Sequence, residues 1–148
     1  MLRELIRTVP KAGPVVAIDG PAGTGKSSAT KRLSERLGFV HVDTGALYRA
    51  IAYLLLKERG ALETGLDGLS DTEMAEAYQR AVAIAHSTEL HFERKAKLNP
   101  SNRIFADGVD ITSHIRTPEI SMSASRVSAL PAVRTALLSL QRTMGCQG

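Results

Sequence analysis

One stretch, VVAIDGPAGTGKSSATK at residues 15 to 31, constrains the fold of this 148-residue chain more than any other. It places glycines and a proline between an apolar run and a segment with helical periodicity. Gly20, four further residues and then Gly25-Lys26-Ser27 fit the pattern G-x-x-x-x-G-K-[ST]. The glycines of such a loop let backbone N–H groups converge on phosphate oxygens, and the following helix adds partial positive charge. The sequence therefore predicts a phosphate-binding P-loop. A tight glycine turn without a ligand is the alternative.

The elements around the loop predict the class of fold. The apolar run Val15–Asp19 is expected to be a buried strand, and a helix from Ser27 to Gly38 follows, with Ala29, Leu33 and Leu37 on one face. Residues 39–43 (FVHVD) predict a second strand. A second helix, capped by Asp43 or Thr44, carries an apolar stripe and ends at Gly60; the stripe is Leu47, Ala50, Ile51, Leu54 and Leu55. Strand, helix, strand, helix is the order of a parallel α/β sheet.

The pattern changes after residue 60. Residues 61–72 are loop-like, and Ser70 and Glu73 have capping-box spacing before a helix at about residues 72–85. ELHFER and RIFADGVDIT predict strands, with a turn at Asp107-Gly108. Residues 61–116 are therefore expected to form a small α+β insert. Thr117-Pro118 starts another helix, with Ile120, Ala124 and Val127 in period. Leu130-Pro131 interrupts it before the pattern resumes with Val133, Ala136, Leu137 and Leu140.

Composition narrows the choice of partners. The net charge is +4, which suits an anionic partner, but aromatic residues are only 4% and none cluster as a stacking platform for single-stranded nucleic acid. Cys146 is the only cysteine, so no internal disulfide can form. The N-terminus lacks the apolar core of a secretory signal, and no apolar run approaches membrane-spanning length. We expect a cytoplasmic protein that binds neither nucleic acid nor membrane.

The segment DTGALYR, residues 43–49, is the expected acceptor side of the site. Ligands of open α/β sheets bind beyond the carboxyl ends of the strands, which would bring this segment beside the P-loop. Asp43, Thr44, Tyr48 and Arg49 supply a carboxylate, a hydroxyl, a phenol and a guanidinium there. A guanidinium can hold a phosphate with two hydrogen bonds. The alternative is that Arg49 is a solvated helix residue and Asp43 only a cap.

Several blocks together resemble the bacterial-type cytidylate kinases. They are GPAGTGKSS, DTGALYRA, DGVDITSHIRTPEIS and S-x-V-S-A-L-P-A-V-R, with LLSLQR at the end, and the similarity runs from Val15 to Arg142. The resemblance implies transfer of the ATP γ-phosphoryl group to CMP or dCMP with Mg²⁺. It also implies a P-loop nucleoside monophosphate kinase-like parallel sheet of strand order 2-3-1-4-5. The expected parts are a tail (1–14), the first part of the core (15–60), the monophosphate-binding insert (61–116) and return helices (117–148).

The resemblance assigns roles to residues that match the family's motifs. Lys26 and Arg49 are the expected catalytic residues, Arg49 through the acceptor phosphate, and Ser27 is the expected Mg²⁺ ligand. Thr44 and Tyr48 would shape the acceptor pocket with Asp43, while Ser125 and Arg134 would face the cytosine. The ATP-binding residues would be Gly20, Pro21, Ala22, Gly23, Thr24, Gly25, Lys26, Ser27 and Ser28. We expect a monomer.

The sequence also departs from the family. Relatives continue with a strand bearing G-R-D-x-G-T and with an arginine-rich lid, and neither occurs here. The predicted strands 15–19 and 39–43 would lack the strand that lies between them, which leaves backbone groups unpaired. We therefore expect an incomplete core, part of a longer protein or a truncated product, and little turnover by these 148 residues alone. Two other functions remain open, namely a P-loop kinase for another small acceptor and a nucleotide-binding module without activity.

Overall fold

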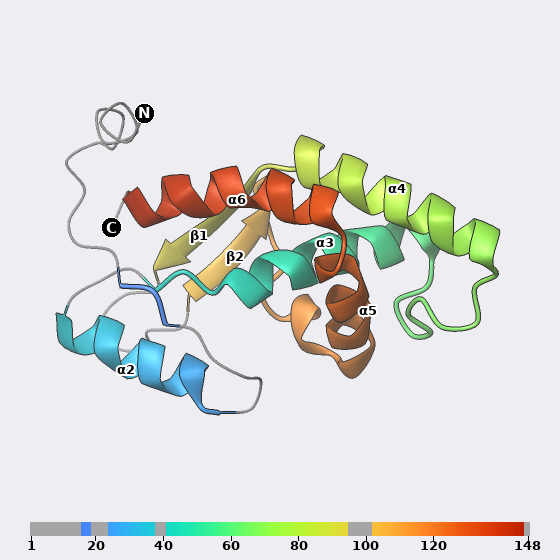
Figure 1. Cartoon of the computed structure of the whole chain (residues 1–148). Helices are drawn as coiled ribbons and strands as arrows, with labels where there is room; N and C mark the ends of the chain where they lie inside the picture. The colour runs from blue at the N-terminus through green and yellow to red at the C-terminus, as the bar shows by residue number, and fades with distance from the viewer. Residues whose placement is uncertain (1–15, 19–23, 38–40, 95–101, 147–148) are drawn as a thin grey trace. The chain divides into compact units, whose positions relative to one another are not determined.

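The computed structural model describes residues 16–18, 24–37, 41–94 and 102–146 (Figure 1). Within them the chain is mixed α/β, with the order α2, α3, α4, β1, β2, β3, η1, α5, α6. The helices are α2 (Lys26–Leu37), α3 (Thr44–Arg59), α4 (Asp71–Ser87), α5 (Pro118–Ser128) and α6 (Pro131–Cys146), and η1 (His114–Arg116) is a short 3₁₀ helix. The chain divides into two compact units: Met1–Val42 with Leu140–Gly148, and Asp43–Ser139.

Helix α3 is the centre of the second unit. It contacts α4, α5 and η1, and eight of its residues are buried. Four members of the predicted stripe, Leu47, Ala50, Ile51 and Leu55, are fully buried, while Leu54 is half-buried. Gly60 ends the helix in the left-handed conformation at φ 65°, and its N–H bonds back to the last turn. The predicted bounds and core face of this helix are confirmed.

The sheet of the second unit has strands in the order β1 (Leu90–Arg94), β2 (Asn102–Ala106), β3 (Val109–Asp110), and both neighbouring pairs are antiparallel. Figure 1 shows β1 and β2 running in opposite directions. Asp107 and Gly108 both have positive φ, 47° and 77°, as a tight hairpin turn between right-twisted strands requires. Leu90, Ile104 and Ala106 share the buried face. The predicted strands and turn are confirmed.

Local capping signals set the other helix ends. Ser70 and Glu73 form the predicted capping box at the start of α4. Thr117 accepts from the Ile120 N–H, and Pro118 occupies the first turn of α5. Ile120, Ala124 and Val127 on α5 are buried, as are Val133 and Leu137 on α6. These expectations are also confirmed.

The prediction of two strands near the N-terminus is not confirmed by the described residues. The described residues 16–18 and 41–43 belong to no strand, and Val16 and Ile18 are 50% and 39% exposed. Residues 15, 19 and 39–40 lie outside the described part. A strand exists only through ladder hydrogen bonds to a neighbouring strand, and residues 16–18 and 41–43 are in no strand ladder of the described residues. Helix α2 forms as predicted, but none of its side chains is buried.

Candidate active site

Within the P-loop motif, the structure describes Thr24, Gly25 and the start of the helix that follows them. Gly25 has φ +83°, a conformation that L side chains rarely adopt. Helix α2 begins at Lys26, and the Ala29 N–H donates to the Gly25 carbonyl at 3.0 Å. Ser27 and Ser28 are exposed in the first turn. The first N–H groups of a helix have no acceptor within the helix, so this geometry suits a phosphate. Gly20, Pro21, Ala22 and Gly23 lie outside the described residues.

On the acceptor side, Asp43 has two partners. It is the N-cap of α3, and its Oδ1 accepts from the Ala46 N–H at 3.1 Å. Its Oδ2 accepts from Arg49 Nη2, also at 3.1 Å. The Arg49 and Asp43 side chains are 26% and 31% exposed, so the pair is partly shielded from water. The structure therefore places the expected carboxylate and guanidinium in direct contact at one end of α3.

The guanidinium of Arg49 lies over the first turn of α3. A Cβ atom at Gly45 would stand 3.3 Å from Asp43 Oδ1 and 3.6 Å from Arg49 Nη1. Arg49 Nε is buried and has no hydrogen-bond partner among the described residues. Thr44 is exposed and Tyr48 half-buried on the same helix. An anion bound here would meet a guanidinium that still has unused donors and a helix N-terminus.

Ser125 and Arg134, expected at the cytosine, lie on either side of the junction between α5 and α6. Both are exposed. Arg134 Nη1 donates to the Ser128 carbonyl at 3.3 Å, and Ser128 Oγ donates to the Ser125 carbonyl at 2.8 Å. Ser128 therefore connects the two residues. They belong to the same unit as Arg49, whereas the P-loop residues belong to the other unit.

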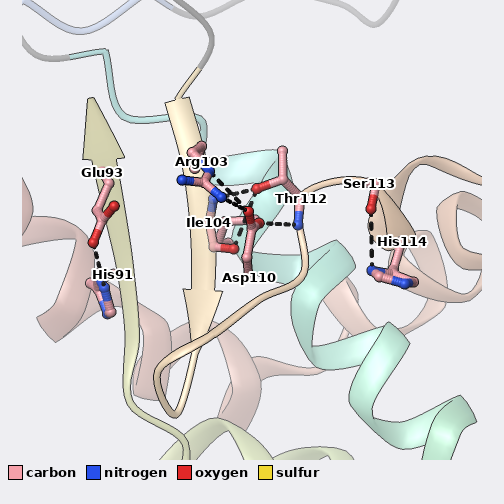
Figure 2. A network of polar contacts seen from close by, with 8 residues as sticks. All are labelled: His91, Glu93, Arg103, Ile104, Asp110, Thr112, Ser113 and His114. Carbon is pink, nitrogen blue, oxygen red and sulfur yellow. Dashed lines mark hydrogen bonds and ion pairs between the residues drawn. The ribbon is translucent and has the colours of Figure 1, made fainter. Parts of the chain in front are cut away.

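A polar network on the sheet was not predicted from the sequence (Figure 2). Arg103 pairs with Asp110, whose Oδ1 accepts from the Thr112 N–H at 3.0 Å. Hydrogen bonds from Thr112, followed by those from Arg103 and its charge, lower the pKa of Asp110 to about 2. Thr112 Oγ1 also accepts from the Ile104 N–H at 2.9 Å. The network fixes β3 and the chain that leads to η1. Strand β2 pairs with β3 so that Phe105 lies opposite Asp110, and no pattern in the sequence signals the contact between Arg103 and Asp110.

A second unpredicted contact joins the 61–69 loop to α5. Arg126 donates to the Leu66 carbonyl at 3.3 Å and to Asp67 Oδ1. No local pattern signals a pair separated by about sixty residues. Among the described residues, no group of three or more His, Cys, Asp or Glu side chains could hold a metal ion.

Comparison with known proteins decides the family. The sequence model of the family described as cytidylate kinase matches residues 16–148. The chain belongs to the cytidylate kinase family. A cytidylate kinase of Desulfitobacterium hafniense (strain Y51) is 44% identical over 133 residues, which are 90% of this chain and 50% of that protein. A cytidylate kinase of Citrifermentans bemidjiense is 41% identical over 136 residues, 92% of this chain and 52% of that protein.

A bifunctional pantoate ligase/cytidylate kinase of Synechococcus elongatus is also similar, at 37% identity over 91% of this chain and 24% of that protein. The chain thus spans about half the length of the curated cytidylate kinases it matches. The matched range contains the P-loop residues and the residues from Asp43 to Arg134 that were expected to bind the acceptor. No helix among the described residues is long and apolar enough to cross a membrane.

Proposed function

We propose that the intact protein transfers the γ-phosphoryl group of ATP to CMP or dCMP. The observation that carries the proposal is the family match over residues 16–148, with cytidylate kinases 41–44% identical to this chain. Because the chain spans about half of those relatives, the reaction, its substrates and its Mg²⁺ requirement are proposed for the whole protein. We propose further that it acts in the cytoplasm as a monomer.

On the donor side, the residues from Gly20 to Ser28 bind ATP. The left-handed Gly25 and the helix start at Lys26 support this role, because the first N–H groups of a helix point toward its N-terminus, where phosphate oxygens bind. Lys26 balances the charge of the β- and γ-phosphates, and Ser27 supplies a hydroxyl ligand for Mg²⁺. When bound, Mg²⁺ neutralises charge that develops on the transferred group.

On the acceptor side, Arg49 binds the phosphate of CMP, with Thr44 and Tyr48 beside it. Its partly shielded guanidinium favours this role, since a charge-assisted hydrogen bond strengthens as water is excluded. Ser125 and Arg134 bind the cytosine. Cytosine presents an amino donor and two acceptors, so a hydroxyl and a guanidinium can satisfy it together. Uracil reverses part of that pattern and is expected to bind more weakly.

A coupled assay on the intact protein tests the proposal with CMP, dCMP, UMP and AMP as acceptors. We expect CMP and dCMP to be preferred, and Arg49→Ala to raise the KM for CMP about tenfold or more while the KM for ATP changes little. Arg59→Ala is the matched control, because Arg59 is exposed at the opposite end of the same helix. A preference for AMP or UMP would identify a different acceptor class. ATP binding without any turnover would instead indicate a nucleotide-binding module.

A further inference from the structure

We propose that Asp43 is a positioning residue that holds Arg49 in place for the acceptor phosphate, rather than a residue that contacts the substrate. The inference rests on the proposed function, in which Arg49 binds the phosphate of CMP. Asp43 caps α3 with one carboxylate oxygen and holds the guanidinium with the other, both at 3.1 Å. The phosphate-binding side chain is therefore ordered before CMP arrives.

The type of residue at the cap supports this role. Helices α4 and α5 of the same unit are capped by hydroxyl groups, those of Ser70 and Thr117. A hydroxyl caps a helix about as well as a carboxylate does. A hydroxyl at position 43 would be too short to reach Arg49 while it also bonds to the Ala46 N–H. The carboxylate thus supplies a second contact that capping alone does not need.

Gly45 gives the pair the space it occupies. Its φ is not positive, so the backbone does not require glycine there, and glycine is unfavourable inside a helix. An alanine Cβ would stand 3.3 Å from Asp43 Oδ1, closer than most Cβ contacts, and 3.6 Å from Arg49 Nη1. The glycine therefore allows the carboxylate and the guanidinium to lie together over the first turn of α3.

The pairing with Asp43 leaves hydrogen-bond donors on the Arg49 guanidinium for a ligand, as a binding residue requires. Asp43 engages only Nη2, and the buried Nε has no acceptor among the described residues. The hydrogen bond to Asp43 uses one of the four hydrogens on the two Nη atoms, which leaves other Nη hydrogens that can donate to a phosphate. Asp43 thus fixes the guanidinium without consuming its capacity to bind a phosphate.

Removing Asp43 should weaken CMP binding by a predictable amount. Ordering one flexible side chain on binding lowers affinity by about twofold to tenfold. Because Asp43 orders Arg49 before CMP binds, the intact protein avoids this loss of affinity. Asp43→Ser keeps a good cap and eliminates the contact with Arg49, so its effect should be of that size. Asp43→Asn also keeps a cap, and serves if the serine variant folds poorly. Gly45→Ala should weaken CMP binding similarly while it favours the helix.

The test measures the Kd of CMP and of ATP by calorimetry on the intact protein, for Asp43→Ser, Arg49→Ala and the double variant, with the Tm of each. We expect Asp43→Ser to raise the Kd of CMP about twofold to tenfold, with the Kd of ATP unchanged and the Tm nearly so. In the Arg49→Ala background, Asp43→Ser should cause no further change, because its effect acts through Arg49.

Each way in which the inference can be wrong predicts a different set of Kd values for CMP. If Arg49→Ala leaves the Kd of CMP unchanged, the proposed role of Arg49 is wrong. If Arg49→Ala weakens CMP binding but Asp43→Ser does not, Asp43 is only a cap and the inference is overturned. It is equally overturned if Asp43→Ser tightens CMP binding, since Asp43 would then compete with the phosphate. A loss that persists in the Arg49→Ala background would show that Asp43 contacts the substrate itself.

Discussion

Gly65 stands against α5 in a backbone conformation that other residues rarely adopt. Its φ is +67°, it is buried, and an added Cβ would lie 3.2 Å from Ser123 Oγ and 3.7 Å from the Glu119 carbonyl oxygen. Ser123 is itself 2% exposed, so its side chain has little room to move. Gly65→Ala therefore combines two separate costs, the strain of the left-handed backbone and a close contact in the core.

Gly60 separates these costs because it has almost the same φ, +65°, and nothing within 4 Å of an added Cβ. A left-handed alanine costs about 1–2 kcal/mol, of which roughly 0.4–1 kcal/mol is offset by the lower entropy of the unfolded chain. Gly60→Ala should thus destabilise by about 1 kcal/mol. Displacing the Ser123 side chain from its rotamer adds about 0.5–1.5 kcal/mol, so Gly65→Ala should cost roughly 2 kcal/mol.

Urea unfolding followed by circular dichroism measures the free energy of unfolding of both variants. The Ser123→Ala background then tests the cause, because without the Oγ atom Gly65→Ala should cost no more than Gly60→Ala. Equal destabilisation by the two glycine variants in the original chain would refute the contact. A difference that survives Ser123→Ala would show that the extra cost arises from some other neighbour.

Three further expectations concern pH, capping and local stability. The pKa of Asp110 is lowered to about 2 from an ordinary 3.8, so its contribution to stability is present above about pH 4 and is lost as the pH falls toward 2. Acid unfolding of Asp110→Asn should therefore show a weaker pH dependence in that window, and an identical profile would contradict the assignment. Ser70→Ala should lower the free energy of unfolding in urea by about 1 kcal/mol, because it removes the capping box of α4. Hydrogen exchange of the 148-residue chain should be far slower for buried amides of α3 than for those of α2, which has 12 residues and no buried side chain. Equal protection of the two helices would contradict this reasoning.

Elements that depend on nearby residues could be predicted from the sequence. Gly60 stops α3, Ser70 starts α4 and Thr117-Pro118 starts α5 because caps and left-handed glycines act within a few residues. The Asp107-Gly108 turn follows from backbone conformations that few other residue pairs adopt. These local signals predict closely where the helices and strands of the second unit begin and end.

Elements that depend on distant partners could not be predicted in this way. The apolar run before the P-loop has the composition of a buried strand, yet its described residues 16–18 pair with no strand. Composition gives a segment its preference, but only a neighbouring strand supplies the hydrogen bonds. The candidate site also has features that local motifs predict and contacts that they do not. Its residue types were readable from the motifs, whereas the shared carboxylate of Asp43 depends on how Arg49 folds back over Gly45.

The arrangement of the core explains how the residues proposed to bind the acceptor can hold a fixed geometry. Arg49 directly precedes Ala50 and comes two positions after Leu47, and both of these apolar residues are fully buried. Ser125 follows the buried Ala124, and Arg134 follows the fully buried Val133. Successive helix positions differ by about 100°, so each polar side chain stands at the margin of a packed face. Because close-packed interiors resist displacement, the backbone that carries these side chains is anchored by burial in the same unit. In the proposed function, selectivity for the acceptor is therefore built on helices α3, α5 and α6, and Asp43 adds a constraint on Arg49, a long side chain that packing leaves partly exposed.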